Sequence, residues 1–510
     1  MKTKVELQTR HSRRSARLGA ALLLLLVTAC IIGTPVNPPA TEVPAEDVAT
    51  DTKEQPVPTT AQPEEETPTE EPVQTQEPTS MGYLSGSGPW LLVQTEQGLL
   101  AFNPDGSGRT VVINQSILAP GPLQKAVSPL GDKIAVITST NPDSFFFNLT
   151  LQMISFPSAI PLFTRKLTSP DTEPTSDLQP GTNQIEINRA LTEFPSFAWA
   201  PYGLRLAFIG AFEGPSADVY TYLMADGTLE RHTDGPAQAY RPFWSPEGRY
   251  LIQTAADTFG TGAGYSVTGI YATRVNEGGN FPLYSIPAQS GDELGLGWLD
   301  PETLVVESWF GGCGFSDLRI MNLTTRKITM LKKDCVTAAA VASSGGTVVF
   351  STGNEVYKAT VGLPASVKIS SEDIQEIRWS PESKMFFAQS TNGTILEIAL
   401  TGKTQTTPSK GFPIVSPDGR YWAWIPVYLS DTETGVWAGE YGLVQSRVFP
   451  GEVPAWNGIA QLIWAQDSQS FYFVDSQGDL YRTWVSTWSP ERIATGLELS
   501  RLDLSLAWAW

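Results

Sequence analysis

Short runs of apolar residues that alternate with polar ones recur along the chain after about residue 85, and turn residues separate them. The pattern is clearest between residues 197 and 232. It predicts four strands there: Phe197–Trp199, Leu204–Ile209, Val219–Met224 and Leu229–His232. The same alternation returns at residues 347–360 and 470–484. No stretch of comparable length shows apolar positions at helical spacing, so we expect an all-β chain.

A turn motif joins the first two strands of each such unit. In Trp244-Ser-Pro-Glu-Gly248, proline presets φ and glycine supplies the positive φ of a tight reversal. Related turns begin at Val127, Trp199, Trp379 and Val415, and weaker ones at Trp298, Ala342 and Trp464. The eight starts are 72, 45, 54, 44, 37, 36 and 49 residues apart. Except for the first gap, this spacing is typical of four-stranded propeller blades.

The two ends of the repeat region each predict part of a blade. Trp90–Thr95, Leu99–Phe102 and Thr110–Ile113 form three strands that lack a first one, and Leu504–Trp510 alternates like a single strand. We expect them to share one blade, which closes the ring and removes open sheet edges. The eight internal units and this shared one predict nine blades, or eight if one weak copy is not a blade.

The turn Val415-Ser-Pro-Asp-Gly-Arg420 resembles the repeats of TolB-like and WD-type propellers of the bacterial cell envelope, and the resemblance covers residues 85–510. It implies a single large propeller. TolB carries an additional α/β domain before its propeller, which has no counterpart here. We therefore expect a signal peptide at 1–29, a tether at 30–82 and a β-propeller at 83–510.

The amino-terminal segment has the features of an export signal. Six basic residues precede or begin the apolar run Leu18–Ala29, which at 12 residues is too short to span a bilayer. Val27–Cys30 resembles a bacterial lipobox, which implies that Cys30 carries a lipid. The lipid would hold the protein on the outer face of the cytoplasmic membrane, or at the outer membrane in a diderm. The alternative is an ordinary signal peptide or anchor helix that happens to contain a cysteine.

Residues 31–80 are rich in Pro, Thr and Glu, with eleven acidic residues and one basic residue, Lys53. Such a segment buries no core, so we expect a disordered, extended tether. The net charge of the whole chain is −19. The signal region contributes +5 and the tether −10, so the propeller has a net charge of −14. This charge argues against nucleic acid as a partner. It also argues against membrane contact other than through the lipid.

Two cysteines remain besides Cys30. We expect Cys313 in a loop between the second and third strands of its blade and Cys335 in the loop to the next blade. These two kinds of loop emerge on the same face of a propeller. The two thiols therefore either form a disulfide, as an oxidising compartment favours, or stay unpaired.

The sequence gives no positive sign of catalysis. His232 is the one histidine after the signal region, and we expect it in a surface turn. A Gly-x-Ser-x-Gly motif is absent, and no hydrolase domain follows the predicted closing strand. We find no metal-binding motif and no cofactor fingerprint, so catalytic residues, metals and cofactors are not predicted.

Aromatic residues in predicted loops are the remaining candidates for a ligand-binding face. They are Phe212, Phe259, Tyr265, Trp309, Phe310, Tyr428, Trp437 and Trp456. Loop aromatics on a rigid scaffold often bind protein or glycan, although they also cap the apolar cores of blades. We therefore expect a monomeric binding or scaffolding module for a protein or cell-wall glycan. The alternative is an exported hydrolase or lyase acting on polysaccharide or peptide, with carboxylates in the central channel.

Overall fold

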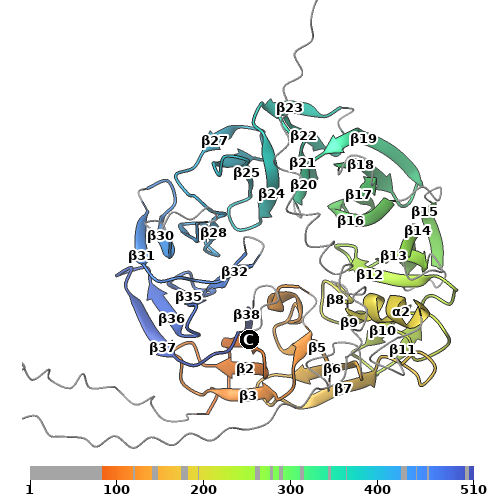
Figure 1. Ribbon diagram of the computed structural model, residues 1–510, viewed down its shortest axis with the longest axis horizontal. Coiled ribbons are helices and arrows are strands. Elements are labelled where there is room, and N and C mark those ends of the chain that lie inside the picture. Colours follow the sequence, from red (N-terminus) through yellow and green to blue (C-terminus); the bar gives the residue numbers. More distant parts are fainter. Residues whose placement is uncertain are drawn as a thin grey trace, which may run out of the picture. The chain divides into compact units, whose positions relative to one another are not determined.

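Nine four-stranded antiparallel sheets form the blades of a propeller in this computed structural model (Figure 1). Figure 1 shows the first strand of a blade toward the centre of the ring and the fourth toward its rim. The structure describes residues 83–118, 121–139, 148–173, 182–192, 195–258, 265–275, 280–285, 291–310, 315–342, 346–362, 365–426, 434–443, 445–456, 459–499 and 505–510. The prediction of an all-β propeller is confirmed, with nine blades rather than eight.

We number the blades I to IX and give their strands from the centre outward. Blade I comprises β38 (Leu506–Ala509), β1 (Trp90–Thr95), β2 (Gly98–Phe102) and β3 (Thr110–Ile113). Blade II comprises β4 (Ile117–Leu118), β5 (Lys133–Thr138), β6 (Thr150–Ser155) and β7 (Pro161–Lys166). Blade III comprises β8 (Phe197–Trp199), β9 (Arg205–Gly210), β10 (Asp218–Leu223) and β11 (Leu229–Arg231).

The next three blades contain the longest strands. Blade IV comprises β12 (Gln238–Trp244), β13 (Tyr250–Thr258), β14 (Tyr265–Arg274) and β15 (Asn280–Ser285). Blade V comprises β16 (Gly291–Asp300), β17 (Thr303–Phe310), β18 (Phe315–Asn322) and β19 (Lys327–Val336). Blade VI comprises β20 (Ala338–Ala342), β21 (Thr347–Ser351), β22 (Val356–Thr360) and β23 (Val367–Ser370).

The last three blades follow the same order. Blade VII comprises β24 (Ile374–Ser380), β25 (Met385–Ser390), β26 (Ile395–Ala399) and β27 (Thr404–Thr406). Blade VIII comprises β28 (Ile414–Val415), β29 (Tyr421–Trp424), β30 (Val436–Glu440) and β31 (Ser446–Phe449). A hairpin of β32 (Ala455–Trp456) and β33 (Ile459–Ala460) precedes blade IX, which comprises β34 (Leu462–Trp464), β35 (Ser470–Val474), β36 (Leu480–Trp484) and β37 (Pro490–Ala494).

The two ends of the repeat region share blade I, as predicted. Strand β38 pairs antiparallel with β1, and Leu91 lies opposite Trp508. The indole Nε1 of Trp508 donates to the carbonyl oxygen of Trp464 in blade IX at 2.7 Å. The backbone N–H of Trp510 donates to Gly131 of blade II at 2.9 Å. Residues near the carboxyl end therefore connect the first blade to both of its neighbours.

The tryptophans of the turn motif connect successive blades in the same way. The indole N–H of Trp199 donates to Ala126 at 2.8 Å, and that of Trp244 to Ala198 at 2.9 Å. Trp464 likewise donates to Ile414 at 2.7 Å. In two other copies of the motif, at Trp298 and Trp379, the indole nitrogen is buried and has no partner among the described residues. The motif thus supplies both the turn and, in several blades, a hydrogen bond across the blade interface.

A helix interrupts the all-β pattern between blades II and III. α2 (Thr182–Thr192) is the one α-helix of the described residues, and it corrects the expectation that the chain has none. Its residues Ile187, Ala190 and Leu191 are buried, and the Tyr240 hydroxyl donates to the Glu186 carbonyl at 3.1 Å. This insertion accounts for the 72-residue first gap between turn motifs. In the described part of the chain, no helix is long and apolar enough to cross a membrane.

Candidate functional site

A cavity of about 330 Å³ lies where blades III and IV meet, and we call it the Gln253 pocket. A row of small residues creates it, because the strand register places Ala255 of β13 opposite both Ala239 of β12 and Gly269 of β14. Side chains larger than alanine would fill this space. The lining residues are Thr233, Asp234, Gly235, Pro236, Ala237, Ala239, Gln253, Ala255, Asp257, Thr268 and Tyr271.

The side chain of Gln253 lines this pocket from β13 and is only 2% exposed. Its Oε1 atom is buried and accepts no hydrogen bond from any described residue. An acceptor left in this state costs about 1–3 kcal/mol. An unpaired acceptor beside a cavity is explained if a ligand supplies the missing donor.

Two carboxylates also line the pocket. Asp257 lies on the same face of β13 as Gln253, because side chains two or four positions apart in a strand point the same way. It is exposed and makes no ion pair or hydrogen bond to the described residues. Asp234 contributes from the connection between blades III and IV, with its side chain 83% exposed. The half-buried ring of Tyr271 lies on β14 opposite Gln253. The pocket therefore offers oxygen acceptors and negative charge together with an aromatic side chain.

A buried aspartate fixes the connection that forms one wall of the pocket. Asp218 of β10 is fully buried and accepts hydrogen bonds from Arg231 and Thr233, each at 2.7 Å. Arg231 also donates to Asp234 at 2.9 Å, which holds that carboxylate beside the cavity. Burial raises the pKa of Asp218, although these donors oppose the shift. The charge network therefore positions the wall before any ligand arrives.

The imidazole of His232 stands in the same connection but does not line the pocket. Its side chain is only 3% exposed, so the expectation of a surface turn residue is wrong for the ring. Nε2 shares a hydrogen bond of 2.8 Å with the Thr221 hydroxyl. Burial lowers the pKa of His232, a shift that Glu230 opposes and Arg205 reinforces. The histidine therefore supports the fold here and presents no exposed base.

A larger cavity, of about 420 Å³, lies against the innermost strands of blades III and IV. Its walls are mostly apolar and include Trp199, Trp244 and Trp510. The indole nitrogens of Trp199 and Trp244 already donate to backbone carbonyls. Gln124 likewise bonds to the backbone of Trp508. Because these polar groups already have partners within the protein, they do not select a particular ligand. This cavity is therefore a weaker candidate for a binding site.

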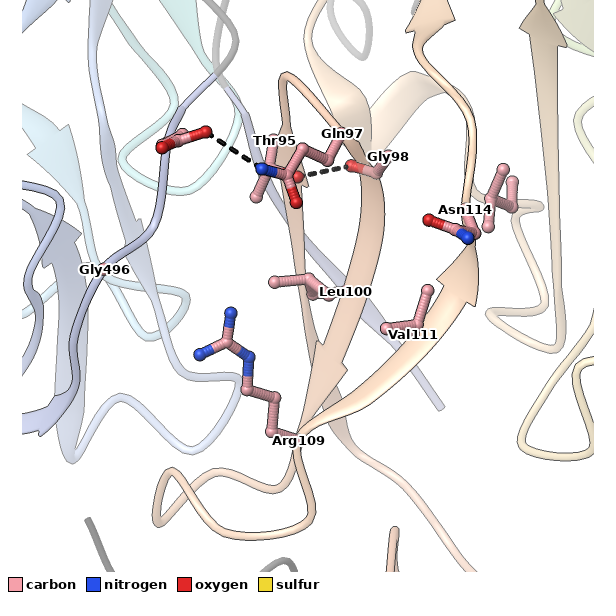
Figure 2. A pocket seen from close by; sticks show the side chains of 10 residues that line it. Thr95, Gln97, Gly98, Leu100, Arg109, Val111, Asn114 and Gly496 are labelled. Carbon is pink, nitrogen blue, oxygen red and sulfur yellow. Dashed lines mark hydrogen bonds between the residues drawn. The ribbon is translucent and has the colours of Figure 1, made fainter. Parts of the chain in front are cut away.

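A smaller cavity of about 160 Å³ lies at the seam between blade I and the segment after β37 (Figure 2). In Figure 2, Gln97 donates to Glu498 at 3.0 Å, and the Thr95 hydroxyl donates to the Gly98 carbonyl at 3.1 Å. The Arg109 guanidinium points into the space between Leu100 and Gly496 in this view. Arg109 and Glu498 are both exposed at the surface, and none of the polar atoms that line this seam is both buried and unpaired.

The structure places the predicted aromatics in different settings. Phe212 packs against Phe208 and Tyr220, with the Arg165 guanidinium 4.1 Å above its ring. Trp437 lies within β30 rather than in a loop. Four others stand at strand ends instead of in loops, and their side chains lie outside the description: Tyr265, Trp309, Phe310 and Trp456. Phe259 and Tyr428 lie outside the described residues.

The predicted cysteine sites remain predictions. Cys30 and Cys313 lie outside the described residues. Cys335 lies within β19 rather than in a loop, and its side chain is not described. Over the described ranges, no group of three or more His, Cys, Asp or Glu side chains is arranged to hold a metal ion.

Sequence comparison finds one short likeness. No protein-family model matches the chain. It is 36% identical over 58 residues to the uncharacterized peptidase YuxL of Bacillus subtilis (strain 168), which is 11% of this chain. The matched region spans only 9% of the length of that curated relative.

Solved structures resemble the chain distantly. An oligogalacturonate lyase in complex with manganese is 14% identical, with a TM-score of 0.36 over 57% of this chain and 89% of its own. Dipeptidyl peptidase 4 of Porphyromonas gingivalis is 9% identical, with a TM-score of 0.45; the match covers 74% of this chain and 59% of the peptidase. A prolyl endopeptidase is 12% identical, with a TM-score of 0.38; the match covers 74% of this chain and 52% of the endopeptidase. At such scores the nine-blade architecture rests on the strand pairing of this chain, not on these likenesses.

Proposed function

We propose that the propeller is a binding module that takes an arginine side chain of a protein partner into the Gln253 pocket. The buried, unpaired Oε1 of Gln253 carries the proposal, because it belongs to a residue that lines a cavity, from which a ligand can supply the missing donor. The negative charge of Asp257, and of Asp234 beside its partner Arg231, favours a cationic donor. A guanidinium suits the site better than an ammonium, since it is planar, weakly hydrated and able to stack on the ring of Tyr271.

The charge of the whole propeller supports a basic partner. A net charge of −14 on residues 81–510 attracts cationic segments over a distance of several ångströms and speeds their association. The pocket then selects among them by hydrogen-bond geometry. We expect binding to weaken as salt is added, because surface charges are screened within about 10 Å at 0.1 M ionic strength.

Calorimetric titration with two blocked tripeptides tests the proposal. One carries arginine in its centre and the other citrulline, which has nearly the same shape without the charge. The arginyl peptide should bind at least about tenfold more tightly, because a hydrogen bond to a charged group contributes about 1.5–3 kcal/mol. Asp257→Asn should reduce that preference by a similar factor.

Gln253→Leu provides the sharpest variant. It removes the unpaired acceptor at similar volume, so the protein should become more stable to urea while it loses arginine binding. A residue with a structural role alone would not show both changes. Glu247→Gln is the matched control, since it removes an exposed carboxylate of the same blade in the turn after β12. Equal binding of the two peptides, or unchanged binding in Gln253→Leu, would contradict the proposal.

Attachment to the membrane through a lipid on Cys30 is part of the same proposal, with a disordered tether between lipid and propeller. The basic and apolar segments before Cys30 support it. Cys30→Ser should move the protein from the membrane fraction to the soluble fraction without changing its melting temperature. Retention of the variant in membranes after an alkaline wash would count against the lipid.

Catalysis on peptide or polysaccharide is the second candidate function. The 58-residue likeness to a curated peptidase favours it. The same cleft that binds arginine would then present a substrate. Incubation of the full chain with arginine-containing peptides and with acidic polysaccharides, followed by mass spectrometry, tests this candidate. New cleavage products that require the protein would favour it over binding alone.

A further inference from the structure

Blade VIII carries a second pocket, of about 340 Å³, around two tryptophans. Trp424 of β29 and Trp437 of β30 lie opposite each other in the strand register, so both project from the same face of the sheet. Their rings stack with centroids 5.3 Å apart and planes within 9° of parallel. Trp424 is buried, so the half-buried Trp437 supplies the flat apolar face that lines the cavity, and we call this face the tryptophan platform. The cavity is also lined by Pro408, Lys410, Gly442, Leu443 and Gln445, and we call it the Trp437 pocket.

The amide of Gln445 gives this pocket a fixed polarity. The indole Nε1 of Trp424 donates to Gln445 Oε1 at 2.6 Å. An indole N–H can only donate, so this bond determines which end of the amide faces Trp424. The other end, Nε2, is buried and has no partner among the described residues. The pocket therefore holds an unpaired donor beside its aromatic wall.

The Gln445 amide offers an unpaired N–H donor, and Lys410 brings positive charge to the same cavity. A ligand that matches them has a carboxylate and additional oxygen acceptors, and a flat face of C–H groups to lie on the negative face of an indole. Leu443, 58% exposed, adds apolar surface at the same cavity.

We propose that the Trp437 pocket binds a pyranose that bears a carboxylate, as one unit of an acidic glycan. The sugar ring lies on the tryptophan platform, its hydroxyl oxygens accept from Gln445, and its carboxylate pairs with Lys410. The cavity volume stands at the lower end of the range of about 300–1,000 Å³ typical of ligand sites, which suits one sugar unit. This site lies in a different blade from the Gln253 pocket and does not depend on the arginine proposal.

Titration of the full chain with methyl β-D-glucuronide and methyl β-D-glucoside, followed by saturation-transfer NMR or calorimetry, tests this site. The glucuronide should bind at least about tenfold more tightly, which corresponds to about 1.4 kcal/mol. Benzoate serves as a third ligand. Benzoate binding as tight as that of the glucuronide would overturn the assignment to a sugar.

Gln445→Glu is the decisive variant. The new carboxylate still accepts from Trp424, but it replaces the donor with negative charge, so glucuronide binding should fall at least tenfold while the urea midpoint stays unchanged. Trp437→Leu should abolish binding of both sugars. Lys403→Met, which removes a lysine from the β26–β27 turn, is the matched control. Equal affinity for the two sugars, or unaltered glucuronide binding in Gln445→Glu, would overturn the proposal. Arginyl-peptide binding should be the same in Gln445→Glu as in the wild type.

Discussion

Each of the two candidate sites has a cavity lined by a residue with a polar side-chain atom that is buried and has no partner among the described residues. Gln253 stands with Thr254 in the otherwise apolar run Tyr250–Ala256, so its sequence signal is a pair of polar residues inside a strand. That signal was available, but the cavity beside it depends on the register of three strands. Ala239, Ala255 and Gly269 lie far apart in the sequence and meet only in the folded sheet. The site itself therefore was not predictable from the sequence.

His232 leads to a prediction about pH. Its buried ring takes up a proton only at a pH below the ordinary value of 6.5, at which the unfolded chain titrates. Between the folded and unfolded pKa values the unfolded chain binds more protons. The stabilisation from this group is therefore full above about pH 6.5 and lost as the pH falls. His232→Gln should flatten the dependence of the urea midpoint on pH between 7 and 5. Parallel curves for variant and wild type would refute this role.

At the scale of the element, the turn motif predicts strands well and helices poorly. The predicted Phe197–Trp199 matches β8 residue for residue, and the alternation at residues 347–360 begins with β21 and ends with β22. α2 was not predicted because its eleven residues are too few to show a clear helical spacing of apolar positions. Strands such as β17 extend further than the sequence indicates, which takes Trp309 out of the predicted loop. Strand ends depend on pairing with neighbours, which alternation alone does not reveal.

The indole hydrogen bonds between blades lead to a paired prediction. Trp244 and Trp298 are both buried, at 6% and 5% exposure, but only Trp244 has a partner for its Nε1. Replacement by phenylalanine removes similar volume at both sites. Trp244→Phe also breaks a hydrogen bond across the blade interface, whereas Trp298→Phe removes an unpaired donor. Trp244→Phe should therefore lower the free energy of unfolding by about 1–3 kcal/mol more than Trp298→Phe does. Urea denaturation measures the difference, and equal losses would contradict the account.

The whole molecule depends on a blade made from two distant segments. Leu91 and Val93 of β1 share a core with Leu506 and Trp508 of β38, and the same core includes Tyr472 of blade IX. The sequence predicted this closure because each end supplied the strands that the other lacked. It did not predict the contact of Trp510 with blade II, which the three-dimensional position of Gly131 determines.

Deletion of residues 504–510 tests the closure. Leu506 and Trp508 each contribute about 2–3 kcal/mol by burial, and a typical domain is stable by only about 5–15 kcal/mol. The truncated protein should lose most of its stability and aggregate through the exposed edge of β1. Deletion of Trp510 alone is the control, because it leaves β38 paired. A truncated protein that sedimented as a monomer with an unchanged melting temperature would show that β38 is dispensable.

The central claim is that the propeller recognises a cationic side chain at the Gln253 pocket, and a crystal structure of the full chain with the arginyl peptide tests it most directly. The account predicts density for a guanidinium in this pocket, with a nitrogen about 2.7–3.2 Å from Gln253 Oε1 and a second one paired with Asp257. An empty pocket at saturating peptide, or a peptide ordered elsewhere on the propeller, would contradict it.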